Sequence, residues 1–129
     1  MRQERFKRDN EDSLVILQCH FPNHEIALAL DTGASHTTID LTALQIAGYD
    51  IADAYELTKI ETAGGIIEAY LFKVTEFTAL GITKRNFTLC SYDFFAHQVL
   101  SDFDGVLGLD FIDDYKICVD FRNSVVTLI

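Results

Sequence analysis

The sequence is poor in basic residues, and this shortage excludes whole classes of partner. It has 10 Lys and Arg side chains against 20 Asp and Glu, so the formal net charge is −10. Affinity for nucleic acid depends on cations that neutralise phosphates, and anionic membranes attract clusters of Lys and Arg. We therefore expect no nucleic-acid partner and no membrane partner. The basic residues that do occur near the start are followed by acids, which predicts a polar, flexible tail over residues 1–12 and one domain over 13–129.

Long apolar runs and secretion signals are also missing. No apolar stretch approaches the about 18 residues that span a bilayer, and no charged segment followed by an apolar one opens the chain. The three cysteines, Cys19, Cys90 and Cys118, are odd in number, scattered and flanked by apolar residues. This usage favours small, reduced core side chains over a disulfide framework. Together these features predict a cytoplasmic protein.

What remains is the composition of one folded domain. The chain has 129 residues, of which 49 % are hydrophobic, enough for a core of its own. Apolar and β-branched residues predict strands over 13–21, 26–31, 55–62, 66–80, 83–92, 117–121 and 125–129. The only proline falls in the turn 22–25 between the first two strands, which therefore form a hairpin.

Helical signals are few and short. Asp40 is a plausible N-cap and Gly48 a plausible stop for one helix. A single helical turn is predicted within 105–116, and the stretch 93–105 fits either a loop or a short helix. The chain is therefore mostly β, with one or two short helices.

Several familiar kinds of catalytic or metal site lack necessary parts. Cys19, His20 and His24 lie close in sequence, but a structural zinc site needs four ligands and no second pair follows. Cys19 and His20 also point to opposite faces of a strand. Ser35 precedes His36, but adjacent side chains diverge and Thr37 replaces the last glycine of a nucleophile elbow. No phosphate-cradling Gly-Lys-Ser/Thr loop is present, so neither a metal nor a cofactor is expected.

One acid stands where the second predicted strand ends. Leu28-Ala29-Leu30 runs directly into Asp31-Thr32-Gly33. Alone, Asp-Thr-Gly is a weak signal, because it also fits an ordinary turn after a strand. The apolar lead-in, the small residues after it and a later Val106-Leu107-Gly108 raise its significance.

In this order the segments resemble the retropepsin-like aspartic proteases, the half-size, dimeric relatives of pepsin. The matching stretches are LDTGAS (30–35), TAGG (62–65), GVLGLDFI (105–112) and the closing hairpin ICVDFRNSVVTL (117–128). Gly108-Leu109-Asp110 is closer to the cellular and bacterial branch than to viral members, which usually have Gly-Arg-Asn or Gly-Arg-Asp. The resemblance implies a closed acid-protease β-barrel with one or two short helices, assembled as a homodimer.

The resemblance also implies roles for the residues of the motif. Asp31 would be the catalytic acid and base, Thr32 would hydrogen-bond across the dimer axis, and Gly33 would direct its N–H towards the carboxylates. Two carboxylates that share one proton can activate water and protonate the carbonyl of a peptide bond. Because the chain has only one such motif, the second carboxylate must come from another copy.

The substrate would be an extended polypeptide held between two segments. Ala34 and Ser35 would lie on one side, and a flap with Ala63, Gly64, Gly65 and Ile66 at its tip on the other. The predicted function is thus an aspartic endopeptidase. Two alternatives stay open: a dimeric peptide- or protein-binding module of the same fold with little or no turnover, and a structural β-domain in which Asp31 merely caps a turn.

Overall fold

The structure is a computed structural model that describes residues 2–8, 14–62, 64–94 and 103–129. The elements in these residues are the strands β1 (Arg2–Arg5), β2 (Ile16–Phe21), β3 (His24–Leu30), β4 (Thr38–Asp40), β5 (Glu56–Thr62), β6 (Gly65–Ala79), β7 (Ile82–Tyr92), β8 (Gly105–Leu107), β9 (Ile117–Asp120) and β10 (Val125–Leu128), and the helices α1 (Leu41–Ile46), α2 (Leu109–Ile112) and the 3-10 turn η1 (Ile51–Asp53). All strands predicted from the sequence are present, with ends shifted by a few residues.

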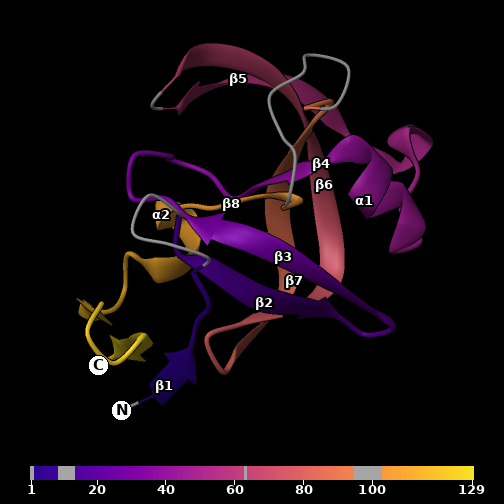
Figure 1. The fold of residues 1–129 in the computed structure, drawn as a ribbon. Coiled ribbons are helices and arrows are strands. Elements are labelled where there is room, and N and C mark those ends of the chain that lie inside the picture. Colours follow the sequence, from indigo (N-terminus) through magenta and orange to yellow (C-terminus); the bar gives the residue numbers. More distant parts are fainter. Residues whose placement is uncertain (1, 9–13, 63, 95–102) are drawn as a thin grey trace.

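Six of the described strands close into a barrel (Figure 1). Their order is β2-β3-β8-β4-β7-β6, and the pairing of His20 with Thr78 joins β6 back to β2. β5 extends the sheet beyond β6 and is an edge strand among those described. The mostly β, closed-barrel architecture expected from the sequence is confirmed.

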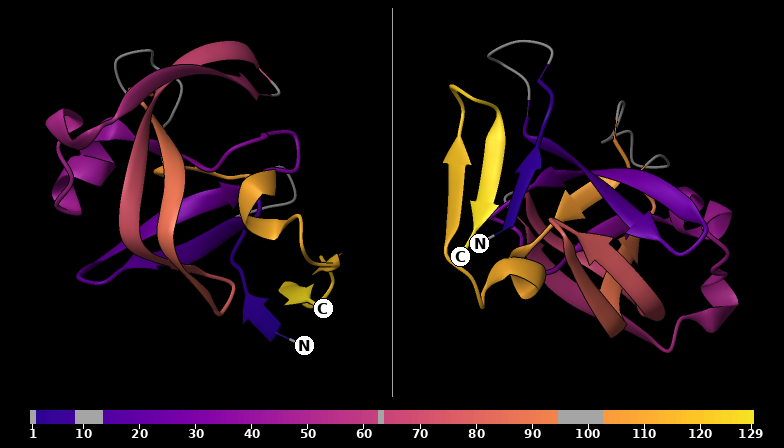
Figure 2. Two further views of the ribbon diagram at one scale, coloured as in Figure 1. Left: turned by 180° about the vertical axis from the view of Figure 1, so that it is seen from behind. Right: turned by 90° about the horizontal axis from the view of Figure 1, so that it is seen from below.

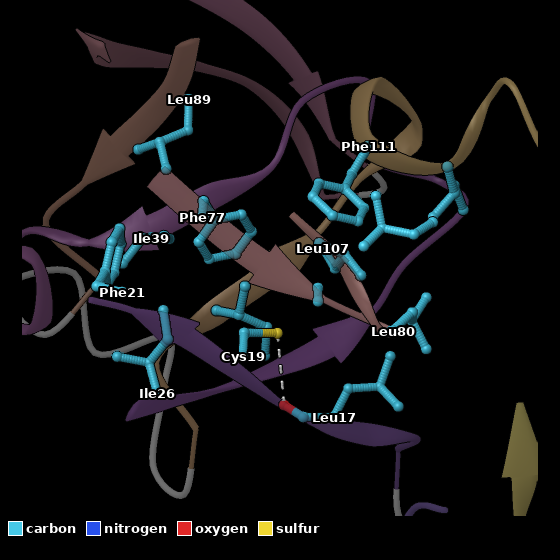
Figure 3. Close-up of a cluster of buried hydrophobic side chains, with 14 of the residues drawn as sticks. Leu17, Cys19, Phe21, Ile26, Ile39, Phe77, Leu80, Leu89, Leu107 and Phe111 are labelled. Atoms are coloured by element: carbon cyan, nitrogen blue, oxygen red, sulfur yellow. Dashed lines mark hydrogen bonds between the residues drawn. The ribbon is translucent and has the colours of Figure 1, made fainter. Parts of the chain in front are cut away.

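Alternation along the strands fills the barrel with apolar side chains. On β2, Leu17, Cys19 and Phe21 are buried, while Gln18 between them is exposed. Figure 3 shows these side chains meeting others that come from β3, β4, β6, β7, β8 and α2. The opposite-face prediction for Cys19 and His20 is confirmed, because His20 is only half-buried and pairs with Glu25 at 3.3 Å.

The strand order places β8 between β3 and β4. β8 runs parallel to β3 and antiparallel to β4. The chain that leaves β3 must therefore pass over the end of β8 to reach β4. This crossing segment, residues 31–37, is called the Asp31 loop below.

Both predicted helices are present. Asp40 caps α1 by accepting hydrogen bonds from the N–H groups of Thr42 and Ala43, as expected for an acidic N-cap. α2 is one turn that follows Gly108. Its Phe111 packs edge-on against Phe77 of β6, with ring centroids 5.6 Å apart at 88°. This aromatic contact fixes α2 to the barrel wall directly behind the Asp31 loop.

Part of the segment predicted as a polar, flexible tail, residues 1–12, forms a strand. Arg2–Arg5 form β1, which pairs with β10 in a separate sheet of order β1-β10-β9 (Figure 2). Phe6 follows it into the core and is only 5 % exposed, and its N–H donates to the carbonyl of Ser124 at 3.0 Å. Backbone pairing at a sheet edge depends little on side chains, so the polar sequence conceals it.

One cysteine also differs from expectation. Cys19 and Cys90 are buried, as predicted, whereas Cys118 is exposed on β9. All three thiols are free. Position 118 points outwards because strand faces alternate and its neighbours Ile117 and Val119 take the inner face.

Two further observations complete the fold. Most of the stretch 93–105, for which loop and short helix were both considered, lies outside the described residues. Among the described residues, no helix is long and apolar enough to cross a membrane.

Candidate active site

The first half of the Asp31 loop is a tight turn held to β8. Asp31 is the first residue after β3. Its N–H donates to the carbonyl of Leu107 at 3.0 Å, which ties the start of the loop to β8. Its Oδ1 accepts from the Gly33 N–H at 2.8 Å, and its carbonyl accepts from the Ala34 N–H at 3.2 Å. Asp31 is half-buried, whereas Thr32 and Gly33 are exposed. The turn thus fixes the carboxylate and leaves the tip of the loop at the surface.

The second half of the loop is held by the start of α2. The N–H of Leu109 donates to the carbonyl of Ala34 at 2.9 Å, and the N–H of Asp110 to that of Ser35 at 3.2 Å. Ala34 is fully buried. Its side chain therefore packs behind the loop, and a direct contact with substrate, as predicted for Ala34, stays a prediction.

A second acid, Asp110, supports the loop from behind. Its Oδ1 accepts from both the N–H and the hydroxyl of Thr37, at 2.8 and 2.7 Å. The same Thr37 oxygen accepts from the Gly108 N–H at 3.1 Å. Asp110 Oδ2 is buried and has no hydrogen-bond partner within the described part of the chain. Desolvation raises the pKa of Asp110, opposed by the Thr37 bonds and by His36 and Lys84.

Sequence reasoning missed Thr37 and Asp110 as parts of the site. The triplet Gly108-Leu109-Asp110 contained a signal for Asp110. A carboxylate this close to the apolar run of β8 is partly buried and needs a hydrogen-bond donor as its partner. That the partner is Thr37 depends on β8 lying between β3 and β4, which the sequence does not reveal.

Gly108 permits a close contact between the end of the Asp31 loop and the residue that joins β8 to α2. A Cβ at this position would lie 2.5 Å from the His36 carbonyl carbon and 2.8 Å from the Thr37 nitrogen. Both atoms belong to the backbone, which has no room to move away. Gly108 therefore has a steric role, because any side chain there would collide with the backbone of the Asp31 loop.

Ser35 and His36 do not diverge as predicted. Ser35 Oγ lies 2.8 Å from His36 Nδ1. The loop between β3 and β4 is not extended here, so the alternation that separates neighbours on a strand does not apply. Ser35 Oγ also donates to the Glu61 carbonyl at 3.2 Å. The tautomer of His36 therefore decides whether the Ser35 hydroxyl donates to Nδ1 or to the Glu61 carbonyl.

The predicted glycine-rich hairpin is present and stands over the loop. β5 and β6 pair from Glu56–Leu71 up to Thr62–Gly65. Gly65 adopts a φ of 116°, with no atom within 4 Å of the place that a Cβ would take, and only glycine adopts this conformation readily. Ile66 beside it is 68 % exposed. Gly64 is exposed, and Ala63 lies outside the described residues.

Other kinds of reactive centre find little support. Among the described residues, no three His, Cys, Asp or Glu side chains gather in a way that could hold a metal ion. Cys90 lies near the loop, but burial, reinforced by the charge of Asp110, raises its thiol pKa to about 12. It is therefore protonated at neutral pH and a poor nucleophile.

A closed barrel with a single acid in a braced turn at a strand end defines the class of acid-protease folds. The sequence profile of the aspartyl protease family matches residues 17–111, which include the Asp31 loop, the hairpin, β8 and the start of α2. The chain belongs to the aspartyl protease family.

Solved structures place the fold within that family. The chain is similar to a retropepsin-like aspartic protease from Rickettsia conorii, with a TM-score of 0.69 and 20 % identity over 98 % of this chain and 89 % of that one. It is also similar to the retroviral protease-like domain of Ddi1 from Leishmania major, with a TM-score of 0.57 and 14 % identity over 89 % and 87 %. At these identities the likeness shows the fold, which is retropepsin-like. No curated protein matches the chain significantly.

Proposed function

We propose that the protein is an aspartic endopeptidase whose active site forms when two copies of the chain bring their Asp31 side chains together. The observation that carries this proposal is the state of Asp31. It is half-buried, fixed by the Gly33 N–H at 2.8 Å, and flanked by the exposed Thr32 and Gly33. Family membership supports the same assignment.

The exposed tip supports a symmetric partner. A braced acid at the surface of one chain has no second carboxylate in the described part of its own loop, and a two-fold axis beside Thr32 would supply one. Thr32 and its counterpart would then hydrogen-bond across that axis. The Gly33 N–H would keep each carboxylate in place.

The chemistry follows from two adjacent carboxylates that hold one proton between them. The ionised carboxylate takes a proton from water, whose oxygen attacks the peptide carbonyl carbon. The protonated one donates to the carbonyl oxygen, which gives a tetrahedral diol. Collapse of the diol breaks the C–N bond: one diol hydroxyl returns its proton to the ionised carboxylate, and the protonated carboxylate donates its proton to the leaving nitrogen. No acyl-enzyme forms, and the dyad ends as it began.

The substrate would be an extended polypeptide lying between the Asp31 loop and the β5–β6 hairpin. The hairpin would act as a flap, with Gly64, Gly65 and Ile66 at its tip over the peptide. Ser35, on the opposite side, offers an N–H and a hydroxyl to the peptide backbone. Ile60 of β5 is buried with Ala69 and Cys90, and Ile67 packs against them, which favours apolar side chains beneath the hairpin.

The test compares wild type with Asp31→Asn on a diverse peptide mixture from acidic to neutral pH, read by mass spectrometry. Loss of the general acid and base should lower cleavage by at least about 10²–10⁴-fold. Asp114→Asn removes an exposed acid charge near α2 and should cleave like wild type. Circular dichroism and sedimentation check that both variants keep the fold and the dimer.

Three results would contradict the proposal. Full cleavage by Asp31→Asn would remove Asp31 from catalysis, and cleavage by a strict monomer would remove the shared dyad. Peptide binding without cleavage by wild type at any pH would favour the alternative, a dimeric binding module.

A further inference from the structure

One carbonyl on the hairpin accepts two hydrogen bonds from the Asp31 loop. The Glu61 carbonyl on β5 accepts from the Ser35 N–H at 3.4 Å and from the Ser35 hydroxyl at 3.2 Å. Glu61 lies one residue before the end of β5. The contact therefore joins the far part of the hairpin to the loop that carries Asp31.

The position of His36 decides where the Ser35 proton points. A hydroxyl has one proton to donate, and the Nδ1–H tautomer of His36 leaves that proton for the Glu61 carbonyl. Ser35 Oγ can then interact with His36 Nδ1, 2.8 Å away, only as an acceptor. This requires a proton on Nδ1, so His36 in its Nδ1–H form turns the hydroxyl towards the hairpin.

The residue that carries the imidazole, His36, lies in the part of the Asp31 loop that is hydrogen-bonded and packed against its neighbours. The His36 carbonyl accepts from the Thr38 hydroxyl at 3.0 Å, and its carbonyl carbon fits against Gly108. Asp110 lies close enough for its charge to interact with the ring. The backbone of His36 is thus held by the loop rather than by the hairpin.

The hairpin also packs on the barrel through one small cluster, in which Ile60 and Ala69 are buried with Cys90 of β7. From Tyr70 onwards β6 pairs with β7, but over Gly65–Ala69 its described strand pairing is with β5 alone. Two strands paired only with each other are marginally stable in water. Hydrogen bonds at Glu61 can therefore decide how far this part of the hairpin opens.

We propose that Ser35 and His36 are positioning residues that form a latch, holding the hairpin down over Asp31 until a peptide replaces it. The proposal rests on the proposed function, because the cleft that the latch closes is the peptide cleft. An entering peptide must separate Ser35 from the Glu61 carbonyl, and its own backbone carbonyl can then accept from the Ser35 N–H and hydroxyl. The latch thus opposes binding and leaves the hydrolytic step to Asp31.

Hydrogen exchange of hairpin amides in the free protein tests the latch without any activity. Ser35→Ala removes the hydroxyl, and His36→Leu removes the group that orients it. In His36→Asn the amide nitrogen replaces Nδ1 as a donor of similar position. Exchange over residues 57–61 and 66–69 should be about three- to tenfold faster in the first two variants, as expected for one lost hydrogen bond. His36→Asn should match wild type, and the Ser35→Ala/His36→Leu double variant should exchange no faster than either single.

Two exchange results would overturn the latch: equal rates in all variants, or His36→Asn as fast as His36→Leu. Peptide kinetics test its role separately. His36→Leu should lower KM with a smaller change in kcat, whereas an unchanged or raised KM would show that the pair does not oppose binding. If wild type cleaves nothing, the proposed function fails, and the exchange rates alone still decide whether the latch exists.

Discussion

The Asp31 loop and the β5–β6 hairpin face each other, and they are built in opposite ways. The loop is held along its length by backbone and side-chain hydrogen bonds to β8 and α2, with Ala34 and Thr37 fully buried. The hairpin extends beyond β7 as two strands, and β5 is the edge of the described sheet (Figure 1).

The difference suits the two tasks that the proposed function gives to these segments. A group that does acid–base chemistry must hold its geometry closely, so its segment is part of the packed core. A segment that admits a long substrate must open at little cost, and few buried contacts make that opening inexpensive. Substitutions in the loop should therefore change global stability, and those in the hairpin should change local opening.

The largest effect is expected for Gly108→Ala. Its Cβ would lie 2.5 Å from the His36 carbonyl carbon, so the loop and β8 must move apart. We expect a loss of at least about 3 kcal/mol in the free energy of unfolding, measured by urea denaturation. Gly48→Ala is the matched control, since Gly48 has a φ of 106° and open space around it and should lose only about 1–2 kcal/mol. Equal losses in both variants would mean that the close approach is unimportant.

A smaller loss is expected for Asp110→Ala. It leaves the N–H and hydroxyl of Thr37 without their acceptor, which should cost about 2 kcal/mol in the free energy of unfolding. Asp110→Asn keeps an oxygen at the same place and should recover most of that loss. A bracing role for Asp110 would be refuted if the Asn and Ala variants were equally unstable.

Gly65→Ala should act on the hairpin alone. A φ of 116° is an unfavourable backbone conformation for any residue other than glycine, yet no atom lies within 4 Å of the added methyl group. We expect faster amide exchange in the hairpin, with a change in global stability within about 0.5 kcal/mol. Gly48→Ala again provides the comparison, because Gly48 follows α1, whose Ala43 and Leu44 are buried in the core, and the same backbone cost there should appear globally. A global loss in Gly65→Ala would show that the hairpin unfolds together with the barrel.

The pH dependence of Asp110 should give the smallest signal. Its pKa is raised in the folded chain by desolvation, so folding favours its protonated form. That contribution is complete below the unfolded pKa and is lost as the pH rises through the folded one. Asp110→Asn cannot titrate, and its stability relative to wild type should therefore increase from acidic to neutral pH. Parallel stability curves for the two proteins would contradict the direction of this shift.

The sequence was sufficient for elements whose signals are local. Strand alternation, the Asp40 cap and the turn at Pro22 each depend on neighbouring residues, and these elements are present. Asp31 stood out because apolar residues lead into it. The site residues predicted around it stay predictions of role, although the structure describes where all of them except Ala63 lie in the fold.

Features that depend on distant neighbours were missed. β1 is polar and pairs through its backbone with β10, so periodicity could not reveal it. Thr37 and Asp110 meet because β8 inserts between β3 and β4. Ser35 and His36 meet because the loop leaves the strand geometry that the sequence argument assumed.

The position of β8 in the sheet also determines when the Asp31 turn can form during protein synthesis. The Asp31 turn emerges early from the ribosome, but the groups that brace it, from Leu107 to Asp110, emerge after most of the chain. Until then the strands already synthesised can pair only with the position of β8, between β3 and β4, left empty. Long-range closure of this kind is slow compared with hairpin formation. The nascent chain therefore cannot complete the hydrogen bonds of the Asp31 turn until β8 and α2 have been synthesised.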